Sequence, residues 1–322
     1  MKTKKIIITG SCGFIGFHVA QIFLKNNFSV IGIDNINSYY DKKLKEKRNL
    51  VLRKFRNYKF HKLDIRSKKI NKLFRDKSIV LVIHLAAQAG VRYSLSNPEK
   101  YFESNLSGFF NIIENIRKNK IRNFFFASTS SVYGDSKKSV LSESDFTDKP
   151  IQFYAATKKS NEAMAYSYSK IYDINTTCLR FFTVYGPWGR PDMSLFKFVK
   201  AIKEGKKIDV FNYGKHSRSF TYIDDISQAV FGLFKKNKQR KNKFETYNLG
   251  NNKSIDLIKF IEIIEKNIGK KSKKNFMPLQ KGDVVKTKAN ISKIKKILPN
   301  FPKYSLDHGV KCFIDWYSEI YK

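Results

Sequence analysis

The chain of 322 residues is poor in cysteine and histidine. Its three cysteines, Cys12, Cys178 and Cys312, are widely separated, and no C-x-x-C spacing occurs. Neither a disulfide framework nor a zinc site is indicated by this pattern. The five histidines are also dispersed, without the spacing of a metal cluster. We therefore predict no bound metal.

Long apolar runs are also missing. No stretch approaches the roughly 20 residues that a membrane-spanning helix needs. The sequence does not open with a basic segment followed by an apolar one. We therefore expect a soluble, cytoplasmic protein with no membrane insertion. The length suits one large domain with a smaller satellite.

Acidic residues are scarce: 27 Asp and Glu stand against 63 Lys and Arg, which gives a formal net charge of +36 at pH 7. Such an excess normally prompts a search for nucleic acid. Lysine greatly outnumbers arginine, however, and is spread along the chain, as in 42–54 and 270–274, mostly on expected solvent faces or loops. With no nucleic-acid motif, we predict no nucleic-acid partner. The positive field should still speed capture of a phosphorylated, acidic substrate.

A glycine-rich turn follows the first apolar run. Gly10, Gly13 and Gly16 come directly after 6–9, where a strand turns tightly into a helix. Glycine lets the backbone approach phosphates closely, and the free N–H groups of a helix start attract an anion. The spacing is G-x-x-G-x-x-G and not the general G-x-G-x-x-G, so on its own the motif predicts no more than an ordinary turn.

A carboxylate further along the chain strengthens this interpretation. Residues 31–33 predict a second strand that ends in Asp34. An acid about 20 residues after the glycines can accept hydrogen bonds from an adenosine ribose diol. No arginine follows closely to pair with a 2′-phosphate. The sequence therefore favours NAD over NADP.

Short β-type runs alternate with longer amphipathic stretches. This alternation predicts a parallel sheet covered by helices, that is, a Rossmann-type, doubly wound α/β fold. The expected strands are Ile6 to Thr9, Ser29 to Ile33, Tyr58 to Leu63, Val80 to Leu85 and Asn123 to Ser128.

From residue 175 onwards the segments become shorter and richer in Gly, Pro and aromatic residues, as in 185–191. We predict a NAD-binding Rossmann domain over residues 1–180, with returns near 220–250. An interleaved, smaller α/β lobe should occupy residues 181–322.

A tyrosine and a lysine stand four residues apart at Tyr154 and Lys158, so on a helix they share one face. An ammonium beside a phenol stabilises the phenolate, and the positive charge of an oxidised nicotinamide lowers the tyrosine pKa further. Such a phenol can act as a general base near neutral pH. Y-x-x-x-K is unspecific by itself.

Hydroxyl side chains support the pair. Thr129, Ser130 and Ser131 come at the carboxyl end of the fifth expected strand. Ligands of open α/β sheets bind at that edge. Hydroxyls there can hydrogen-bond a substrate without adding charge.

Taken together, these features resemble the extended short-chain dehydrogenases/reductases, the family of nucleotide-sugar epimerases, dehydratases and decarboxylases. The likeness runs nearly end to end, and within the family it is greatest to the UDP-glucuronate 4-epimerases. The segments that carry it are Gly10 to Gly16, Asp34 to Asp41, His84 to Ser94, Tyr154 to Lys158, Arg180 to Met193, Phe211 to Gly214 and Phe220 to Asp225.

The resemblance implies an NAD-dependent C4 epimerisation of UDP-glucuronate to UDP-galacturonate, by transient oxidation to a 4-keto sugar and hydride return to the opposite face. Tyr154 would take the proton of the 4-hydroxyl, Thr129 would hydrogen-bond the same oxygen, and Lys158 would also hold the nicotinamide ribose. It also implies a homodimer.

The resemblance, together with the motifs, assigns residues to each ligand. Those expected to bind NAD are Gly10, Gly13, Phe14, Ile15, Gly16, Asp34, Asn35, Asp64, Ile65, Leu85, Ala86, Ala87, Tyr154 and Lys158. Those expected to bind the UDP-sugar are Arg92, Ser130, Ser131, Thr183, Arg190, Phe211, Tyr213, Arg218 and Asp283.

Residue chemistry separates the possible reactions. A 4-keto uronate is a β-keto acid that readily loses CO₂, and hydroxyl donors that solvate its carboxylate oppose this loss. Related decarboxylases typically have Glu at the position of Ser131, and dehydratases an Asp-Glu pair at Ser130-Ser131. We predict an epimerase. The alternatives are a UDP-hexose 4-epimerase acting on a neutral sugar, a UDP-glucuronate decarboxylase and a catalytically silent NAD-binding sensor.

Some residues depart from the family pattern. Ser219 stands where the family usually has Asp, which weakens the expectation that a carboxylate clamps Arg218. Cys12 and Phe17 occupy positions that are more often small. Asn105 resembles an asparagine that supports the active site, and a structural role is equally compatible with the sequence.

Overall fold

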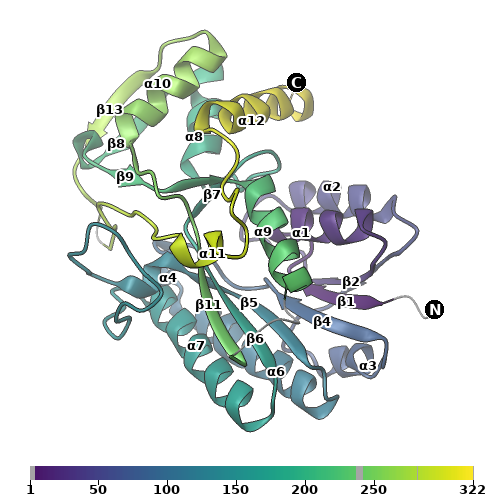
Figure 1. Cartoon of the computed structure of the whole chain (residues 1–322). Coiled ribbons are helices and arrows are strands. Elements are labelled where there is room, and N and C mark those ends of the chain that lie inside the picture. The colour runs from purple at the N-terminus through teal and green to yellow at the C-terminus, as the bar shows by residue number, and fades with distance from the viewer. Residues whose placement is uncertain (1–3, 237–241, 281, 322) are drawn as a thin grey trace.

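The computed structural model describes residues 4–236, 242–280 and 282–321. A seven-stranded parallel sheet forms its centre, with the strand order β11-β6-β5-β4-β1-β2-β3 (Figure 1). The strands of the sheet are β1 (Lys5–Thr9), β2 (Ser29–Asp34), β3 (Tyr58–Lys62), β4 (Ile79–His84), β5 (Asn123–Thr129), β6 (Asn175–Phe181) and β11 (Phe244–Leu249).

The predicted fold class is confirmed. All five expected strands are present with ends that differ by at most one residue, and they pair in parallel. The chain runs outward from β1 to β2 and β3, then crosses back to β4 on the other side. A doubly wound sheet opens a crevice at such a reversal, outside the carboxyl ends of its strands.

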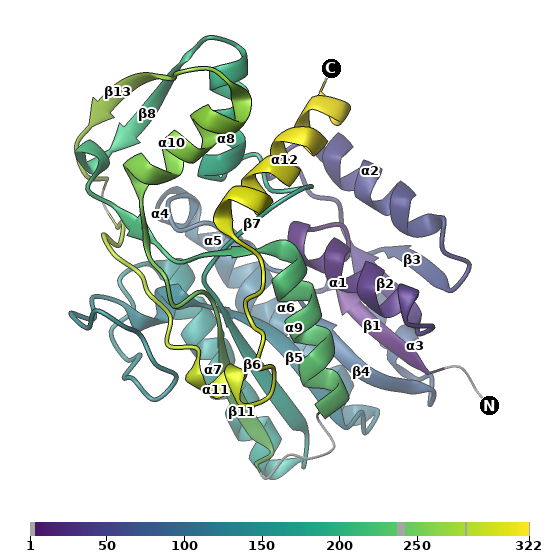
Figure 2. The ribbon, with the colours of Figure 1, turned by 45° about the horizontal axis from the view of Figure 1, so that its top comes forward.

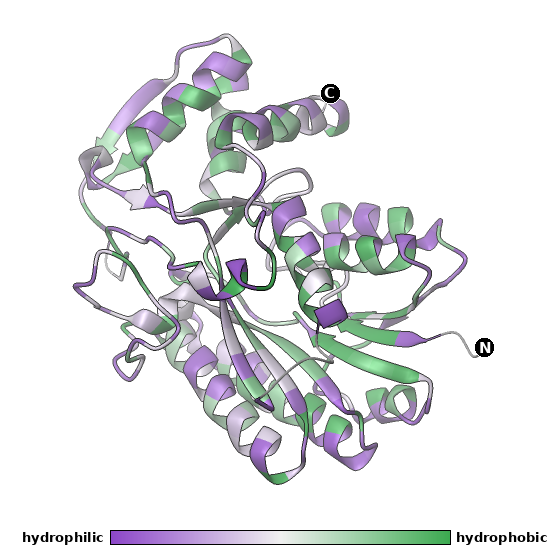
Figure 3. Cartoon of the chain, viewed as in Figure 1, coloured by the Kyte–Doolittle hydropathy of each residue, from purple (hydrophilic) through white to green (hydrophobic). Residues whose placement is uncertain are grey.

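Side chains of successive strand residues enter different cores. In β1, Ile6 and Ile8 pack into one hydrophobic cluster, whereas Ile7 packs into the other. This alternation follows from the pleat, because neighbouring side chains point to opposite faces. Apolar residues fill the central strands β1 and β4, in agreement with burial on both faces, whereas β3 and β6 have a mixed composition (Figure 3).

Two groups of helices cover the faces of the sheet. Helices α1 (Phe14–Lys25), α2 (Lys42–Arg53) and α9 (Ile223–Lys236) share one side, and α1 packs against both of the others. Helices α3 (Asn71–Phe74), α6 (Gly108–Lys118) and α7 (Phe153–Ile171) lie on the opposite side, where α6 contacts α3 and α7.

A smaller lobe stands above the carboxyl edge of the sheet (Figure 2). In it β8 pairs in parallel with β13, and α10 packs against α8 and α12. Its elements are α8 (Ser194–Lys203), β8 (Lys207–Phe211), η4 (Asn212–Gly214), α10 (Leu257–Ile268), β13 (Lys273–Met277) and α12 (Leu306–Ile320).

Two further strand pairs lie outside the large sheet. β7 (Thr183–Tyr185) pairs in parallel with β10 (Phe220–Tyr222), and β9 (Ser217–Arg218) pairs antiparallel with β12 (Ile255–Asp256). The remaining short elements are η1 (Lys68–Ile70), α4 (Tyr93–Ser96), α5 (Pro98–Tyr101), η2 (Phe102–Ser107), η3 (Ser130–Tyr133) and α11 (Ser292–Lys295).

In the part of the chain that the structure describes, every helix is too short or too polar to serve as a membrane span. The same residues contain no cluster of His, Cys, Asp and Glu that could hold a metal ion.

Candidate active site

A cavity opens at the carboxyl ends of the central strands, where the sheet reverses direction. Its wall includes every residue that the sequence predicts for NAD: Gly10, Gly13, Phe14, Ile15, Gly16, Asp34, Asn35, Asp64, Ile65, Leu85, Ala86, Ala87, Tyr154 and Lys158. Thr129 lines it as well. The structure thus brings together in one hollow residues that lie up to 148 positions apart in the chain, from Gly10 to Lys158.

The glycine turn at the floor of the cavity depends on missing side chains. Gly10 has φ +73°, and a Cβ atom there would lie 2.7 Å from the backbone nitrogen of Ala86. A Cβ atom on Gly16 would collide with the carbonyl oxygen of Gly10. Gly13 is the N-cap of α1, and no side chain accepts a hydrogen bond from the first N–H groups of that helix. These free donors fit the pyrophosphate of a dinucleotide.

Asp34 is a buried carboxylate that contacts the glycine turn. Asp34 is only 9% exposed, and it accepts hydrogen bonds from the backbone N–H groups of Ile36 at 2.8 Å and Cys12 at 3.0 Å. Burial raises its pKa, while these hydrogen bonds and the charge of Lys45 oppose the shift. A carboxylate has further lone pairs beyond two hydrogen bonds, so Asp34 can also accept from a ribose diol.

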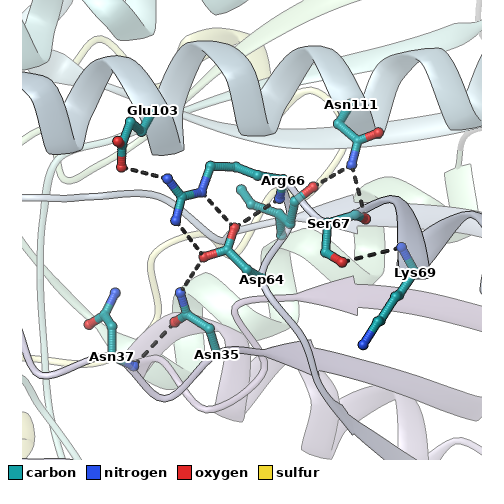
Figure 4. A network of polar contacts seen from close by, with 9 residues as sticks. Asn35, Asn37, Asp64, Arg66, Ser67, Lys69, Glu103 and Asn111 are labelled. Carbon is teal, nitrogen blue, oxygen red and sulfur yellow. Dashed lines mark hydrogen bonds and ion pairs between the residues drawn. The ribbon is translucent and has the colours of Figure 1, made fainter.

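A second acidic residue lies beside it in a polar network (Figure 4). Asp64 accepts hydrogen bonds from Asn35 at 3.0 Å and from Nε of Arg66 at 2.9 Å. Arg66 also binds Glu103 at 2.5 Å. Burial alone would raise the pKa of Asp64, but the hydrogen bonds from Arg66 and Asn35 outweigh it, so the pKa is lowered. The carboxylate is therefore held charged and in a fixed orientation at the cavity wall.

Tyr154 and Thr129 meet inside the cavity. Tyr154 lies in the first turn of α7, Thr129 ends β5, and the two side chains are hydrogen-bonded. Burial raises the pKa of Tyr154, whereas the bond with Thr129 and the charge of Arg190 oppose this rise. Burial is thus the largest effect on the pKa of Tyr154, and Arg190 is a cation that opposes it. The expected lowering by Lys158 together with an oxidised nicotinamide stays a prediction.

Lys158 lies one helical turn after Tyr154 and is 1% exposed. Burial lowers its pKa to about 8, against the opposing effects of Cys178 and Glu162. Glu162, one turn further, accepts two hydrogen bonds from Arg180, at 2.9 and 2.8 Å. The face of α7 that carries the tyrosine and lysine is therefore anchored to β6 by a buried ion pair.

Asn105 supports this helix from the other side. It is 1% exposed, accepts a hydrogen bond from the N–H of Gln88 at 2.8 Å and donates to Thr157 at 3.0 Å. Asn161 donates to its carbonyl oxygen at 2.6 Å. Asn105 lies in η2, a π-helical segment, and such segments are frequent at functional sites. These partners belong to the loop after β4 and to α7, so Asn105 joins the two.

Among the residues predicted for the UDP-sugar, Arg190 lines the cavity. It binds Asp192 at 3.0 and 2.5 Å, and Tyr39 donates to the same carboxylate at 3.1 Å. Thr183 lines a smaller adjoining pocket, which also includes Arg190. Ser130 and Ser131 lie in η3, directly after Thr129, and Oγ1 of Thr129 donates to Oγ of Ser131 at 3.2 Å.

Three other predicted substrate residues gather at the small lobe, outside the cavity wall. Arg92 binds Asp283 at 2.8 Å, and its guanidinium lies over the ring of Phe211 at 4.8 Å. Tyr213 stays apart from this group and is 58% exposed. Of the predicted substrate residues, Arg190 lines the cavity and Thr183 the adjoining pocket, whereas Ser130 and Ser131 belong to neither wall.

Arg218 is held by carbonyl oxygens. It donates to Val285 at 2.8 Å and to Ser217 at 3.0 Å, and no ion pair joins it to an acid in the described chain. Burial lowers its pKa, with Asp283 opposing. Ser219 is fully buried, accepts from the N–H of Asn251 at 2.7 Å and donates to its carbonyl at 2.8 Å. Ser219 thus holds the backbone at Asn251 in place. Because position 219 is not acidic, it cannot form an ion pair with Arg218.

Several cavity residues were not predicted individually from the sequence. They are Asn37, Tyr39, Tyr40, Lys45, Leu63, Ala89, Ser104, Ala127, Ser128, Phe181, Phe182, Val184 and Met193. The expected solvent face of residues 42–54 is also partly wrong, because Lys45 and Arg48 are buried. The sequence contains a pattern that could have indicated this burial. Leu44, Arg48 and Leu52 repeat every four residues and so share one helix face.

Known proteins share this architecture. The family model described as "NAD dependent epimerase/dehydratase family" matches residues 6–250. An uncharacterised protein of Methanocaldococcus jannaschii is 49% identical over 99% of this chain and 98% of its own length. The UDP-glucuronate 4-epimerase of Thermodesulfobacterium geofontis is 42% identical, with 97% and 96% coverage.

The fold comparison agrees. The crystal structure of UDP-glucuronic acid 4-epimerase from Bacillus cereus, in complex with UDP-glucuronic acid and NAD, superposes with a TM-score of 0.92 at 34% identity. It covers 98% of this chain and 100% of the Bacillus chain.

Proposed function

The chain belongs to the NAD dependent epimerase/dehydratase family and is an NAD-dependent nucleotide-sugar epimerase, and on that premise we propose that it interconverts UDP-glucuronate and UDP-galacturonate. The observation that carries the proposal is the placement of hydroxyl groups around the predicted base. Thr129 hydrogen-bonds Tyr154, and Ser131 lies 3.2 Å from Thr129. The positions next to the base thus supply neutral donors and no carboxylic acid.

The cofactor fits the residues present. Gly10, Gly13 and Gly16 shape a cradle at the start of α1, whose first N–H groups bind no side chain in the described part of the chain, and the carboxylate of Asp34 lines the cavity beside them. We propose that these groups hold the pyrophosphate and the adenosine ribose, with Asp64 at the adenine. When bound, NAD⁺ supplies the acceptor, and later the donor, of the hydride at C4.

Side chains of the protein carry out the transfer of the proton of the sugar 4-hydroxyl. Tyr154 removes the proton of the sugar 4-hydroxyl and returns it after the hydride has come back. Thr129 holds the phenol and the sugar oxygen in one hydrogen-bonded array. Because burial raises the pKa of Tyr154, its phenolate needs positive charge close by, and Arg190 supplies part of it. Lys158, buried on the same helix face, would add an ammonium toward the nicotinamide ribose.

The sugar carboxylate needs a separate set of donors. We propose that Ser130, Ser131 and Thr183 hydrogen-bond it, and that Arg190, Arg92 and Arg218 pair with the carboxylate or the diphosphate. Charge held by hydrogen bonds does not flow readily into the neighbouring carbonyl, so the 4-keto intermediate keeps its CO₂. Phe211, Tyr213 and Asp283 would contact the uridine.

The same proposal includes the division of the chain into a cofactor domain, 1–180 with returns near 220–250, and a substrate lobe, 181–322. It also includes a cytoplasmic homodimer. Exposed apolar side chains on α6 and α7, Phe110 and Tyr166, support pairing through these helices, since each is 51% exposed.

Proton NMR of the purified protein with UDP-glucuronate tests the function. The 4-epimer should accumulate to equilibrium, with no pentose product and no net change in NAD. UDP-glucose, assayed under the same conditions, should turn over much more slowly. A faster reaction with UDP-glucose would favour a neutral-sugar epimerase, and a UDP-pentose product would favour a decarboxylase. No turnover of either sugar by NAD-loaded protein would support a silent sensor.

A further inference from the structure

A guanidinium is completely buried between the cofactor side of the cavity and the small lobe. Arg48 on α2 is 0% exposed, and within residues 4–236, 242–280 and 282–321 no carboxylate forms an ion pair with it. Burial raises the pKa of Asp34 and the charge of Arg48 opposes this rise, so this carboxylate is near Arg48 without a direct ion pair. A buried charge without a direct ion pair is costly and persists only where hydrogen bonds compensate for it. The hydrogen bonds of Arg48 therefore indicate the structural role of its buried guanidinium.

Those contacts join two loops that are distant in sequence. One terminal nitrogen of Arg48 donates to the carbonyl oxygen of Cys12 at 2.9 Å and to the hydroxyl of Tyr40 at 2.7 Å. The other donates to the carbonyl oxygens of Trp188 at 2.5 Å and Gly189 at 3.3 Å. Cys12 lies in the glycine turn, and 188–189 lead into the substrate lobe. The planar guanidinium has five N–H donors in a fixed geometry and can bind both loops at once, whereas the ammonium of a lysine is a single compact charge.

A second buried donor holds the same turn. Nε2 of His18, on α1, lies 3.0 Å from the carbonyl oxygen of Pro187. Burial lowers the pKa of His18 to about 3, so the ring is neutral, and with Nε2–H as its donor it satisfies this oxygen. Three consecutive carbonyls, of residues 187–189, thus turn toward α1 and α2. Trp188 has φ +61°, an unfavourable conformation for a bulky residue, which these hydrogen bonds hold.

The next residue after this turn is Arg190, which lines the cavity and whose charge acts on Tyr154. We propose that Arg48 and His18 form a latch that fixes residues 187–189 against the glycine turn, and that Arg48 is thereby a positioning residue for Arg190. The inference rests on the proposed function only where activity is measured. The latch itself concerns the conformation of residues 187–189, which can be measured with or without substrate.

Tryptophan fluorescence tests the latch directly. The only two tryptophans, Trp188 and Trp316, lie with ring centroids 5.4 Å apart, and Trp188 also contacts Phe17 at 5.3 Å. Emission therefore reports this turn together with the part of α12 that packs against it. In Arg48→Met we expect a red-shifted maximum and stronger acrylamide quenching in the folded protein. The matched control is Lys47→Met, which removes the neighbouring, exposed cation and should leave both unchanged.

Should Arg48→Met fail to fold, Arg48→Lys serves the same purpose, because it keeps the charge but cannot bridge both loops. Native far-UV circular dichroism and cooperative melting identify the folded samples. Emission and quenching equal to wild type in a folded Arg48 variant would overturn the latch. This readout needs neither substrate nor turnover, so it stands even if the proposed reaction is wrong.

A double-mutant cycle tests the link to Arg190. Arg48→Met should lower kcat/KM for UDP-glucuronate by about tenfold to a hundredfold, the scale of a small misplacement of a binding group. In an Arg190→Met background the same change should have little further effect, because the group it positions is already gone. Fully multiplicative effects would show that Arg48 does not act through Arg190.

Discussion

Oγ1 of Thr129 donates a hydrogen bond to Oγ of Ser131 at 3.2 Å and accepts one from the backbone N–H of Ser131 at the same distance. The threonine beside the predicted base is thus tied to one of the two serine hydroxyls that we propose for the substrate carboxylate. Under the proposed function, the groups for proton transfer and for retention of CO₂ lie in one short segment at the end of β5.

The first prediction concerns this serine. Ser131→Ala removes a donor that we propose for the sugar carboxylate, so a larger share of the 4-keto intermediate should lose CO₂. We expect UDP-pentose to appear in the NMR assay while kcat for epimerisation falls by about tenfold, the cost of losing one hydrogen bond. Ser139→Ala, at an exposed position, is the control. An unchanged product ratio would remove Ser131 from carboxylate control.

The second prediction concerns the base. Tyr154→Phe keeps the ring and removes the hydroxyl, so kcat should fall by about 10²- to 10⁴-fold while NAD stays bound. Stopped assays give kcat, and the absorbance of heat-released cofactor gives the NAD content. Tyr166→Phe, an exposed position on the same helix, should behave as wild type. Wild-type turnover in Tyr154→Phe would contradict the mechanism.

The third prediction concerns pH. Burial lowers the pKa of Lys158 from 10.5 to about 8, so between these values the unfolded chain binds more protons than the folded one. The free energy of unfolding should therefore receive from Lys158 a contribution that rises as the pH increases from 8 to 10. Urea titrations of wild type and Lys158→Met at each pH isolate it. The variant should show a smaller rise, and an equal rise in both would refute the assignment.

The fourth prediction concerns the ion pair behind the active helix. Arg180→Met leaves Glu162 buried without its partner and should cost about 3–5 kcal/mol in the free energy of unfolding. Adding Glu162→Gln should recover part of that loss, because the unpaired charge disappears. Lys311→Met breaks an exposed pair with Asp315 and should leave the free energy of unfolding nearly unchanged. If Arg180→Met and Lys311→Met changed the free energy of unfolding by the same amount, burial would not determine the cost of losing an ion pair.

The sequence is most informative where one residue type is physically required. Gly10 adopts a positive φ, and Asp34 ends a buried strand, so both could be assigned to the cofactor site from pattern alone. The five strands followed from their apolar runs. β6 was not named among them, because its segment Asn175–Phe181 mixes threonine, cysteine and arginine with few apolar residues.

Contacts between distant segments were harder to predict. Arg48 lies in a lysine-rich stretch that was expected mostly to face solvent, and only the fold shows the carbonyls of Trp188 and Gly189 beside it. Sequence spacing reveals the lysine one turn after Tyr154, but not the burial that raises the pKa of the phenol. Where a side chain is buried, and what faces it there, depends on tertiary packing.

The edge strand β11 has a consequence for how the molecule can be made. Its residues 244–249 follow β7, α8, β8 and β10 in the chain, yet they pair along the whole of β6. Any fragment that stops short of residue 244 leaves β6 with one row of backbone groups unbonded, a template for aggregation. Synthesis on the ribosome must therefore pass through much of the small lobe before the seven-stranded sheet can be completed. We expect the two parts to be inseparable as expression units.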